Sequence, residues 1–298
     1  MKTTQPEIKL FPYTTLFRSI LVSQNEEIKA QNEEISAQRD KLFKQHKEIT
    51  DSINYARIIQ SALLPSENLL NEIFTSHFVL FKPRNVVSGD FYWARNLGNP
   101  SVLVVADCTG HGVPGAFMSV MGISLLNEVI KPAENLNPSH VLGEMRQQIK
   151  SLLRQSNRAE GTRDGMDMAI CILDKTNKIL KYAGANISLF LFRNNEITEI
   201  DADKMTVGIH PKDNIDFTSH TANLLPNDRF FLFSDGFADQ FGGKDNRKFK
   251  RQALLSLLAT TSTLNMQDQK KELELAFENF KGNYNQIDDV MVVGFQVL

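Results

Sequence analysis

The first quarter of the chain carries an apolar residue at every seventh position. The members of this column are Leu21, Ile28, Ile35, Leu42, Ile49, Ala56 and Leu63. Glu, Gln and Lys fill most positions between them, and residues 20–64 contain neither Gly nor Pro. The pattern predicts a continuous helix over residues 20–65 that presents one apolar column of a coiled coil.

The companion column of that seam is mostly polar. It consists of Asn25, Asn32, Arg39, His46, Ile53 and Gln60. Polar residues at core positions specify register at a cost in stability, so we expect a weak, parallel, two-stranded coil, with a solvated single helix as the alternative. Beyond Ile49 the apolar face widens to include Ile59, Leu63 and Leu64. This widening predicts that the helix end packs against the following domain before Pro65 stops the helix.

Strands and helices follow in irregular alternation. Strands are expected at residues 77–82, 90–96, 101–106, 168–174, 179–185, 188–193, 216–224, 229–234 and 290–298. Helices are expected at residues 114–130, 138–155, 250–260 and 266–280. Because strands stand before, between and after the helices, and do not alternate one to one with them, the order predicts an α+β sandwich and not a Rossmann fold.

The composition is that of a globular protein without a strong electric field. The 298 residues suffice for one large domain or two small ones, and 42% are hydrophobic. A net charge of −2 does not favour nucleic acid or an anionic membrane. The two cysteines, Cys108 and Cys171, do not make a disulfide framework and fit a reducing cytosol. We expect no membrane span, because no run of about 18 apolar residues is evident.

The N-terminal segment has an unusual origin. Residues 10–19 resemble the translation of a common sequencing-library adapter. We interpret residues 1–19 as non-native and exclude them from fold reasoning, as for a cloning scar. A short native apolar arm is the alternative. We expect the native protein to extend further upstream and to carry a sensory part there.

One strand end combines a carboxylate with a tight turn. The apolar run at residues 102–106 stops at Asp107, and Gly110, Gly112 and Gly115 follow before a helix begins. A carboxylate at such a position suits a hard cation, although Asp and Gly are also ordinary turn residues. The segment alone therefore leaves both interpretations open.

Three further segments repeat this design. Asp90, Asp235 and Asp288, the last followed by Asp289, each stand where a β-branched or aromatic run meets a loop. Their carboxylates converge only if the strands share one end of a sandwich, and such a cluster repels itself unless cations occupy it. Oxygen ligands without a matching Cys or His set favour Mg²⁺ or Mn²⁺ over zinc.

In this order and spacing, the four segments resemble the SpoIIE/RsbU-type branch of the PP2C (PPM) serine/threonine phosphatases. The resemblance covers residues 78–298, with further similar stretches at residues 53–65, 180–186 and 233–243. It implies an α-β-β-α sandwich preceded by a long helix. The implied divisions are a non-native segment (1–19), a coiled-coil signalling helix (20–65) and a phosphatase domain (66–298).

The resemblance also implies a role for each carboxylate. Asp107 would bridge two Mn²⁺ or Mg²⁺ ions, and the backbone carbonyl of Cys108 would bind one of them. Asp90 would bind the ion on that side. Asp235 and Asp288 would hold the other ion, and the neighbouring Asp289 would support this site.

The remaining candidates surround this centre. A third, weaker metal ion would involve Asp164 or Asp167, for which a polar turn is the alternative. His111 would act as a general acid or as an outer group of the site, and Arg84 would contact phosphate unless it is a plain surface arginine. The turn residues assigned to substrate binding are Gly110 and Gly112.

The expected activity is hydrolysis of phosphoserine or phosphothreonine on a regulatory protein in bacterial signal transduction. The cysteine usage fits a cytoplasmic location, and the heptad pattern predicts a homodimer. The resemblance implies a STAS-type anti-sigma-factor antagonist as substrate and control through the N-terminal helix. A non-catalytic dimeric scaffold with the same fold is the alternative, which the presence of all four carboxylates disfavours. Another two-metal hydrolase, such as a phosphodiesterase, is disfavoured because a histidine-rich metal set is lacking.

Overall fold

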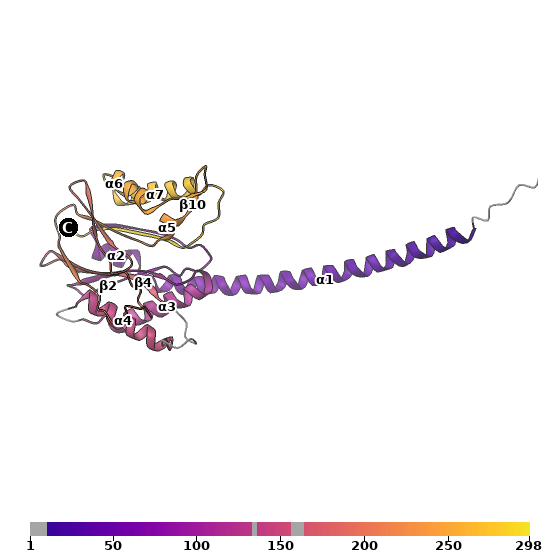
Figure 1. Ribbon diagram of the computed structural model, residues 1–298, viewed down its shortest axis with the longest axis horizontal. Helices are drawn as coiled ribbons and strands as arrows, with labels where there is room; N and C mark the ends of the chain where they lie inside the picture. Colours follow the sequence, from indigo (N-terminus) through magenta and orange to yellow (C-terminus); the bar gives the residue numbers. More distant parts are fainter. Residues whose placement is uncertain (1–10, 133–135, 156–163) are drawn as a thin grey trace, which may run out of the picture. The chain divides into compact units, whose positions relative to one another are not determined.

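The computed structural model describes residues 11–132, 136–155 and 164–298, with side chains from residue 14 onward. It divides into two compact units, Met1–Ile53 and Asn54–Leu298 (Figure 1). Residues 1–10 of the segment interpreted as non-native lie outside the described residues. The division proposed from the sequence, at residues 19 and 65, stays a prediction.

A single long helix, α1 (Phe11–Leu63), accounts for the first unit and extends into the second. The predicted helix is confirmed, and it ends before Pro65 as expected. It begins nine residues earlier than the heptad pattern, so residues 11–19 are helical too. The apolar column is exposed along the first unit, with Leu42 at 65% exposure.

Two five-stranded antiparallel sheets form the centre of the second unit. The first sheet has the order β1 (Ser76–Lys82), β12 (Val290–Gln296), β9 (Arg229–Phe233), β6 (Leu189–Arg193) and β7 (Glu196–Ile200). The second has the order β2 (Phe91–Asn96), β3 (Ser101–Cys108), β4 (Met166–Asp174), β5 (Ile179–Ala185) and β8 (His220–Asn223). A two-stranded hairpin, β10 (Phe241–Gly242) and β11 (Arg247–Lys248), stands apart.

Helices cover the outer face of each sheet (Figure 1). The second sheet is covered by α3 (Gly112–Val129) and α4 (Pro138–Leu152), and the first by α6 (Arg251–Thr260) and α7 (Met266–Lys281). The short helices are α2 (Glu67–Ile73) and α5 (Gly236–Asp239). These four layers confirm the predicted α-β-β-α sandwich.

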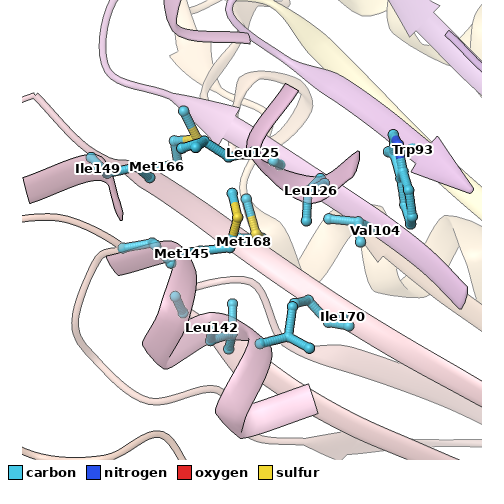
Figure 2. Close-up of a cluster of buried hydrophobic side chains, with 14 of the residues drawn as sticks. Trp93, Val104, Leu125, Leu126, Leu142, Met145, Ile149, Met166, Met168 and Ile170 are labelled. Carbon is cyan, nitrogen blue, oxygen red and sulfur yellow. The ribbon is translucent and has the colours of Figure 1, made fainter. Parts of the chain in front are cut away.

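Strand alternation explains how one apolar run serves two cores. In β3, Val102 and Val104 face the α3–α4 core, while Leu103 and Val105 face the core between the sheets. A strand that is buried on both faces is continuously apolar, which is why the sequence alone predicted β3 from residues 102–106. Figure 2 shows the α3–α4 core, where Met145 of α4 lies beside Met168 of β4.

Several elements of the second unit differ from the sequence expectations. Strands β7, β10 and β11 and the short helices α2 and α5 were not predicted, and the strand expected at residues 216–224 is confined to β8. The β6–β7 connection is Asn194-Asn195 with positive φ at both residues, as in a two-residue hairpin turn. In β7 two glutamates obscure the alternation of apolar and polar residues that would indicate a strand. Charged side chains are typical of a strand at the edge of a sheet.

The predicted packing of the end of α1 needs correction. Ile59 is 47% exposed and Leu63 is 39% exposed, so the widened apolar face is not buried within the chain. Gln60 is buried instead, at 5% exposure, and Leu64 packs against the α3–α4 core. The end of α1 therefore contacts the domain as expected, but through Gln60 and Leu64 and not through Ile59 and Leu63.

Helix α3 combines sufficient length with an apolar composition. Among the described residues, α3 is the one helix that is long and apolar enough to cross a membrane, judged by length and composition alone, with a mean hydropathy of 1.2 over 18 residues. Its buried residues include Leu125 and Leu126, which pack in the core against the second sheet.

Candidate active site and metal centre

The polarity of the strands explains why carboxylates gather at one end of the sandwich. Asp90 precedes β2, Asp107 lies near the end of antiparallel β3, and Asp167 opposes Asp107 at the start of β4. In the other sheet, Asp235 follows β9 and Asp288 precedes antiparallel β12. In antiparallel strands, the end of one and the start of the next share an edge. Both sheets therefore direct their acidic ends to one place.

Asp90 and Asp107 form the buried centre of this cluster. Asp90 is 2% exposed, its carboxylate accepts a 2.6 Å hydrogen bond from the Ser234 hydroxyl, and it is hydrogen-bonded to Asp107. Burial, together with the charges of Asp289 and Asp288, raises the pKa of Asp90 to about 8. Burial and the charges of Asp90 and Asp235 raise the pKa of Asp107 well above its ordinary value. Each carboxylate thus makes ionisation of the others harder.

Asp235 and Asp167 line the more open part of the cluster. Desolvation, followed by the charges of Asp288 and Asp239, raises the pKa of Asp235 to about 6. Burial also raises the pKa of Asp167, and a 2.8 Å hydrogen bond from the Asn186 amide opposes that rise. Both carboxylates line a cavity of about 320 Å³ together with Asp107.

Asp289 holds the loop that carries Asp90. Its two carboxylate oxygens accept 2.7 Å hydrogen bonds from the backbone N–H groups of Arg84 and Gly89. Asp288 in turn accepts a 2.8 Å hydrogen bond from the N–H of Asp289. Asp289 is thus fully engaged with backbone, which fits the supporting role expected for it.

Glycines let the turn after Asp107 approach that loop closely. Gly110 has φ +83°, and a Cβ at Gly89 would lie 2.5 Å from the Gly110 carbonyl oxygen and 3.3 Å from that of Cys108. A Cβ at Gly115 would lie 2.2 Å from the same Gly110 oxygen. The positive φ and the backbone contact explain why side chains are excluded here.

His111 and Arg84 meet at the exposed rim of the cluster. An Arg84 guanidinium nitrogen contacts His111 Nε2, and His111 Nδ1 lies 3.0 Å from Asn85 Oδ1. A guanidinium only donates, so Nε2 accepts and Nδ1 carries the proton that is donated to Asn85. Gly112 packs on Asn85, which holds the turn against this group.

Of the two candidates for a third metal ion, the structure brings Asp167 to the cavity and not Asp164. The Asp164 backbone carbonyl accepts a 2.5 Å hydrogen bond from Gln155, the residue that follows α4 closely. A larger depression of about 990 Å³, lined by Glu128, His140 and other residues of α3 and α4, contains none of the predicted site residues.

The donor set fits a hard divalent cation. All the converging side chains offer oxygen, they are desolvated, and their mutual repulsion raises their pKa values, which a cation would relieve. Among the described residues, however, no group of three or more His, Cys, Asp or Glu side chains is already drawn together as a metal-binding group. The chemistry of the donors supports a metal site, while a finished coordination sphere is not present in that part of the chain.

Several residues of this site escaped the sequence analysis. They are Ser234, Asn186, Asp239, Lys204 and Arg251. From the sequence, Asp239 is interpreted as an ordinary turn residue, yet it lines the cavity. Ser234 and Asn186 lie in stretches that carry the family resemblance, which was the one available signal.

The fold and the acidic cleft together define a PP2C-type phosphatase domain. The sequence model of the family described as Stage II sporulation protein E (SpoIIE) matches residues 98–298. The chain belongs to this family.

Solved structures agree with that assignment. The SiaA-PP2C domain of Pseudomonas aeruginosa is 31% identical, with a TM-score of 0.76 over 84% of this chain and 98% of that one. The SpoIIE phosphatase domain with a regulatory fragment from Bacillus subtilis is 19% identical, with a TM-score of 0.57 over 74% of this chain and 61% of that one. The RsbU and RsbW domains of a Mycobacterium tuberculosis protein are 20% identical, with a TM-score of 0.57 over 75% and 60%. A comparison with curated protein sequences gave no significant match.

Proposed function

We propose that this chain is a metal-dependent phosphatase that hydrolyses phosphoserine or phosphothreonine on a regulatory protein in bacterial signalling. The observation that carries the proposal is the convergence of Asp90, Asp107 and Asp235 at one cleft of a SpoIIE-type fold. A desolvated, self-repelling set of oxygen donors has no evident use in stability, since it costs free energy.

Two Mn²⁺ or Mg²⁺ ions are the cofactors that suit this donor set. Asp107 would hold both ions, Asp90 and the Cys108 carbonyl would hold one of them, and Asp235 with Asp288 would hold the other. A third, weaker ion would bind at Asp167. When bound, such ions stabilise charge on a phosphoryl group and lower the pKa of water. Ser234 and Asp289 hold the Asp90 loop in place for this purpose.

Arg84 is the residue we assign to the phosphate. Its side chain is exposed beside the cluster, while its backbone N–H is fixed by Asp289. His111 accepts from Arg84 through Nε2, so in this arrangement that atom has no proton to give. We therefore assign His111 the orientation of Arg84 ahead of general acid catalysis. The turn at Gly110 and Gly112 brings His111 to Arg84.

Control through the N-terminal helix rests on Gln60. Its amide donates to the Ser88 carbonyl at 2.6 Å and to the Ser119 hydroxyl at 2.8 Å, and its carbonyl accepts from the Ser88 N–H at 3.0 Å. Ser88 is two residues from Asp90, and Ser119 lies on α3. A displacement of the last turns of α1 would therefore move a candidate metal ligand.

The finer assignments follow from the family. We propose a cytoplasmic homodimer joined by a parallel coiled coil over residues 20–65, a phosphatase domain over residues 66–298, and a non-native segment over residues 1–19. A STAS-type anti-sigma-factor antagonist is the proposed class of phosphoprotein substrate. Neither nucleic acid nor a membrane span is part of the proposal.

The proposal is tested by hydrolysis of an aryl phosphate by the full chain with Mn²⁺. We expect metal-dependent turnover that falls by more than about 100-fold in Asp107→Asn and Asp235→Asn. The control is Asp201→Asn, an exposed carboxylate outside the cleft, which should retain parental turnover.

Two results would favour another function. Hydrolysis of a bis-aryl diester, but not of the monoester, would indicate a phosphodiesterase. No turnover of any substrate, even after residues 20–53 are replaced by a sequence that forms a strong parallel dimer, would favour the non-catalytic scaffold.

A further inference from the structure

The cavity beside the acidic cluster is lined by residues of both charges. Asp107, Asp167 and Asp235 line the 320 Å³ space, and so do Lys204 and Arg251. Asn186 and Ser188 are among its other polar residues. A group that occupies this space therefore meets two cations to which the proposed metal site gives no role.

The backbone around Lys204 is fixed in place. The N–H of Asp203 donates to the Gly184 carbonyl, and the carbonyl of Asp203 accepts from the N–H of Asn186, both at 2.9 Å. The Asp203 carboxylate also accepts hydrogen bonds from the backbone and hydroxyl of Thr218. On the other side Met205 is buried in the core. Lys204 itself is exposed at the cleft, so a rigid segment presents its ammonium group.

The two cations differ in their freedom to bind an incoming group. Arg251 contacts the Glu199 carboxylate and stacks 4.9 Å from the ring centroid of Phe190. Lys204 makes no hydrogen bond or ion pair within the described ranges of the chain. Its charge acts only at a distance, where it lowers the pKa of Glu199 and opposes the raised pKa of Asp167.

We infer that Lys204 binds a carboxylate of the substrate next to the phosphorylated residue, so that the cleft selects acidic phosphopeptide segments. The inference rests on the proposed phosphatase function and deepens it. A phosphoryl group held at the carboxylates of this cavity places its neighbouring residues near the rest of the lining, which includes Lys204. An ammonium held there without a partner gains an ion pair from Asp or Glu, and would repel Lys or Arg.

A competing role for Lys204 is to offset the negative charge of the cluster. That role would affect every substrate equally, whereas recognition changes the ratio between substrates. The test therefore uses two phosphoserine peptides of equal length in the full chain, one with Glu on both sides of the phosphoserine and one with Gln there. The measured quantity is the ratio of their kcat/KM values.

We expect the parent to prefer the Glu peptide by about two- to five-fold, the size of one exposed ion pair, and less so in high salt. Lys204→Gln should bring the ratio close to one, and Lys204→Glu should invert it. Lys212→Glu is the matched control, because Lys212 is an exposed lysine of the same segment outside the cleft, and its ratio should equal the parental one. An unchanged ratio in both Lys204 variants would overturn the inference.

A binding measurement separates this inference from the proposed function. The same peptides, labelled with fluorescein, are titrated into Asp107→Asn with and without Lys204→Glu, and anisotropy is read. If the parent hydrolyses neither peptide nor aryl phosphate, the phosphatase proposal fails, while a Lys204-dependent preference in binding still supports recognition. Equal binding of both peptides by both variants would overturn it.

Discussion

A single carboxylate, Asp90, shows that the residues of the candidate metal site lower the stability of the fold without a metal ion. Its oxygens are held by Ser234 and Asp107 in a place that water hardly reaches. Burial there favours the protonated form, so the pKa of about 8 is far above that of an exposed Asp. The group that the proposed function needs as an anion is thus one that the bare fold prefers to keep neutral.

This conflict predicts the pH dependence of stability in the presence of a chelator. A carboxyl whose folded pKa is raised contributes stability that is fully present below its unfolded pKa, near 4, and lost as pH rises through about 8. The free energy of unfolding should therefore fall between pH 5 and pH 8.5. Asp90→Asn should be more stable than the parent at pH 8.5, by about 1–3 kcal/mol, with a gap that narrows toward pH 5.

Denaturant unfolding at several pH values checks this expectation, with Asp201→Asn as the control. Mn²⁺ should reverse the order at pH 8.5, because it binds the parental carboxylate and not the amide. A parental stability that is flat from pH 5 to pH 8.5 in chelator would contradict the assigned electrostatics of the cluster.

At the same scale, the residues that the sequence could predict are those with a local signature. Asp107 and Asp235 each end an apolar run, so their position at a strand end is legible without knowledge of the fold. Ser234 could not be assigned to Asp90, because 144 residues separate them and their 2.6 Å contact depends on how the two sheets pack. Lys204 has no local signature at all, since its significance comes only from the carboxylates with which it lines the cavity.

At the scale of elements, the end of α1 is the part that sequence periodicity misjudged. The heptad rule assigned Gln60 to a polar column and gave the contact with the domain to apolar neighbours. The buried amide instead satisfies both the N–H and the carbonyl of Ser88, which apolar side chains cannot do. Hydropathy identifies which face of the helix is apolar. It does not reveal that the buried backbone N–H and carbonyl of Ser88, in the loop before β2, need polar partners.

Removing this amide should weaken the Asp90 loop. Gln60→Leu leaves the buried N–H of Ser88 without its partner and removes one hydrogen bond each from the Ser88 carbonyl and the Ser119 hydroxyl, which we expect to cost about 1–3 kcal/mol. Because Ser88 leads directly to Gly89 and Asp90, the Mn²⁺ concentration for half-maximal turnover should rise several-fold as well. Gln38→Leu, an exposed change on the same helix, is the control for both measurements.

The Mn²⁺ dependence distinguishes coupling from simple destabilisation. A lower melting temperature with a parental Mn²⁺ requirement would show that Gln60 only supports packing. A raised requirement under conditions where the domain stays fully folded would show that α1 acts on the metal centre.

At the scale of the whole molecule, the two units differ in whether their apolar residues are buried within one chain. The sandwich buries its apolar strands in three cores within one chain. The pattern of elements predicted its α+β class, and the family resemblance implied its four layers. The helix of the first unit has only one good apolar column, and those residues are exposed in a single chain. Any partner for this column therefore has to come from outside the chain, and no contact within one copy can identify it.

We expect that partner to be a second copy in parallel register. Ile28→Asp combined with Ile35→Asp puts two charges into the seam, where a second copy would bury them unpaired. Light scattering on the full chain should report a dimer for the parent and a monomer for this variant. The control, Glu27→Gln combined with Glu34→Gln, alters charge one position before each seam residue and should remain dimeric.

Turnover per subunit extends this prediction to function. If dimerisation orders the last turns of α1, the monomeric variant should show a weaker Mn²⁺ response, in the same direction as Gln60→Leu. A variant that is monomeric yet fully active would separate assembly from control. A parent that is monomeric at every concentration would favour the solvated single helix over the coil, because the polar column of Asn25, Asn32, Arg39 and His46 would then outweigh the apolar one.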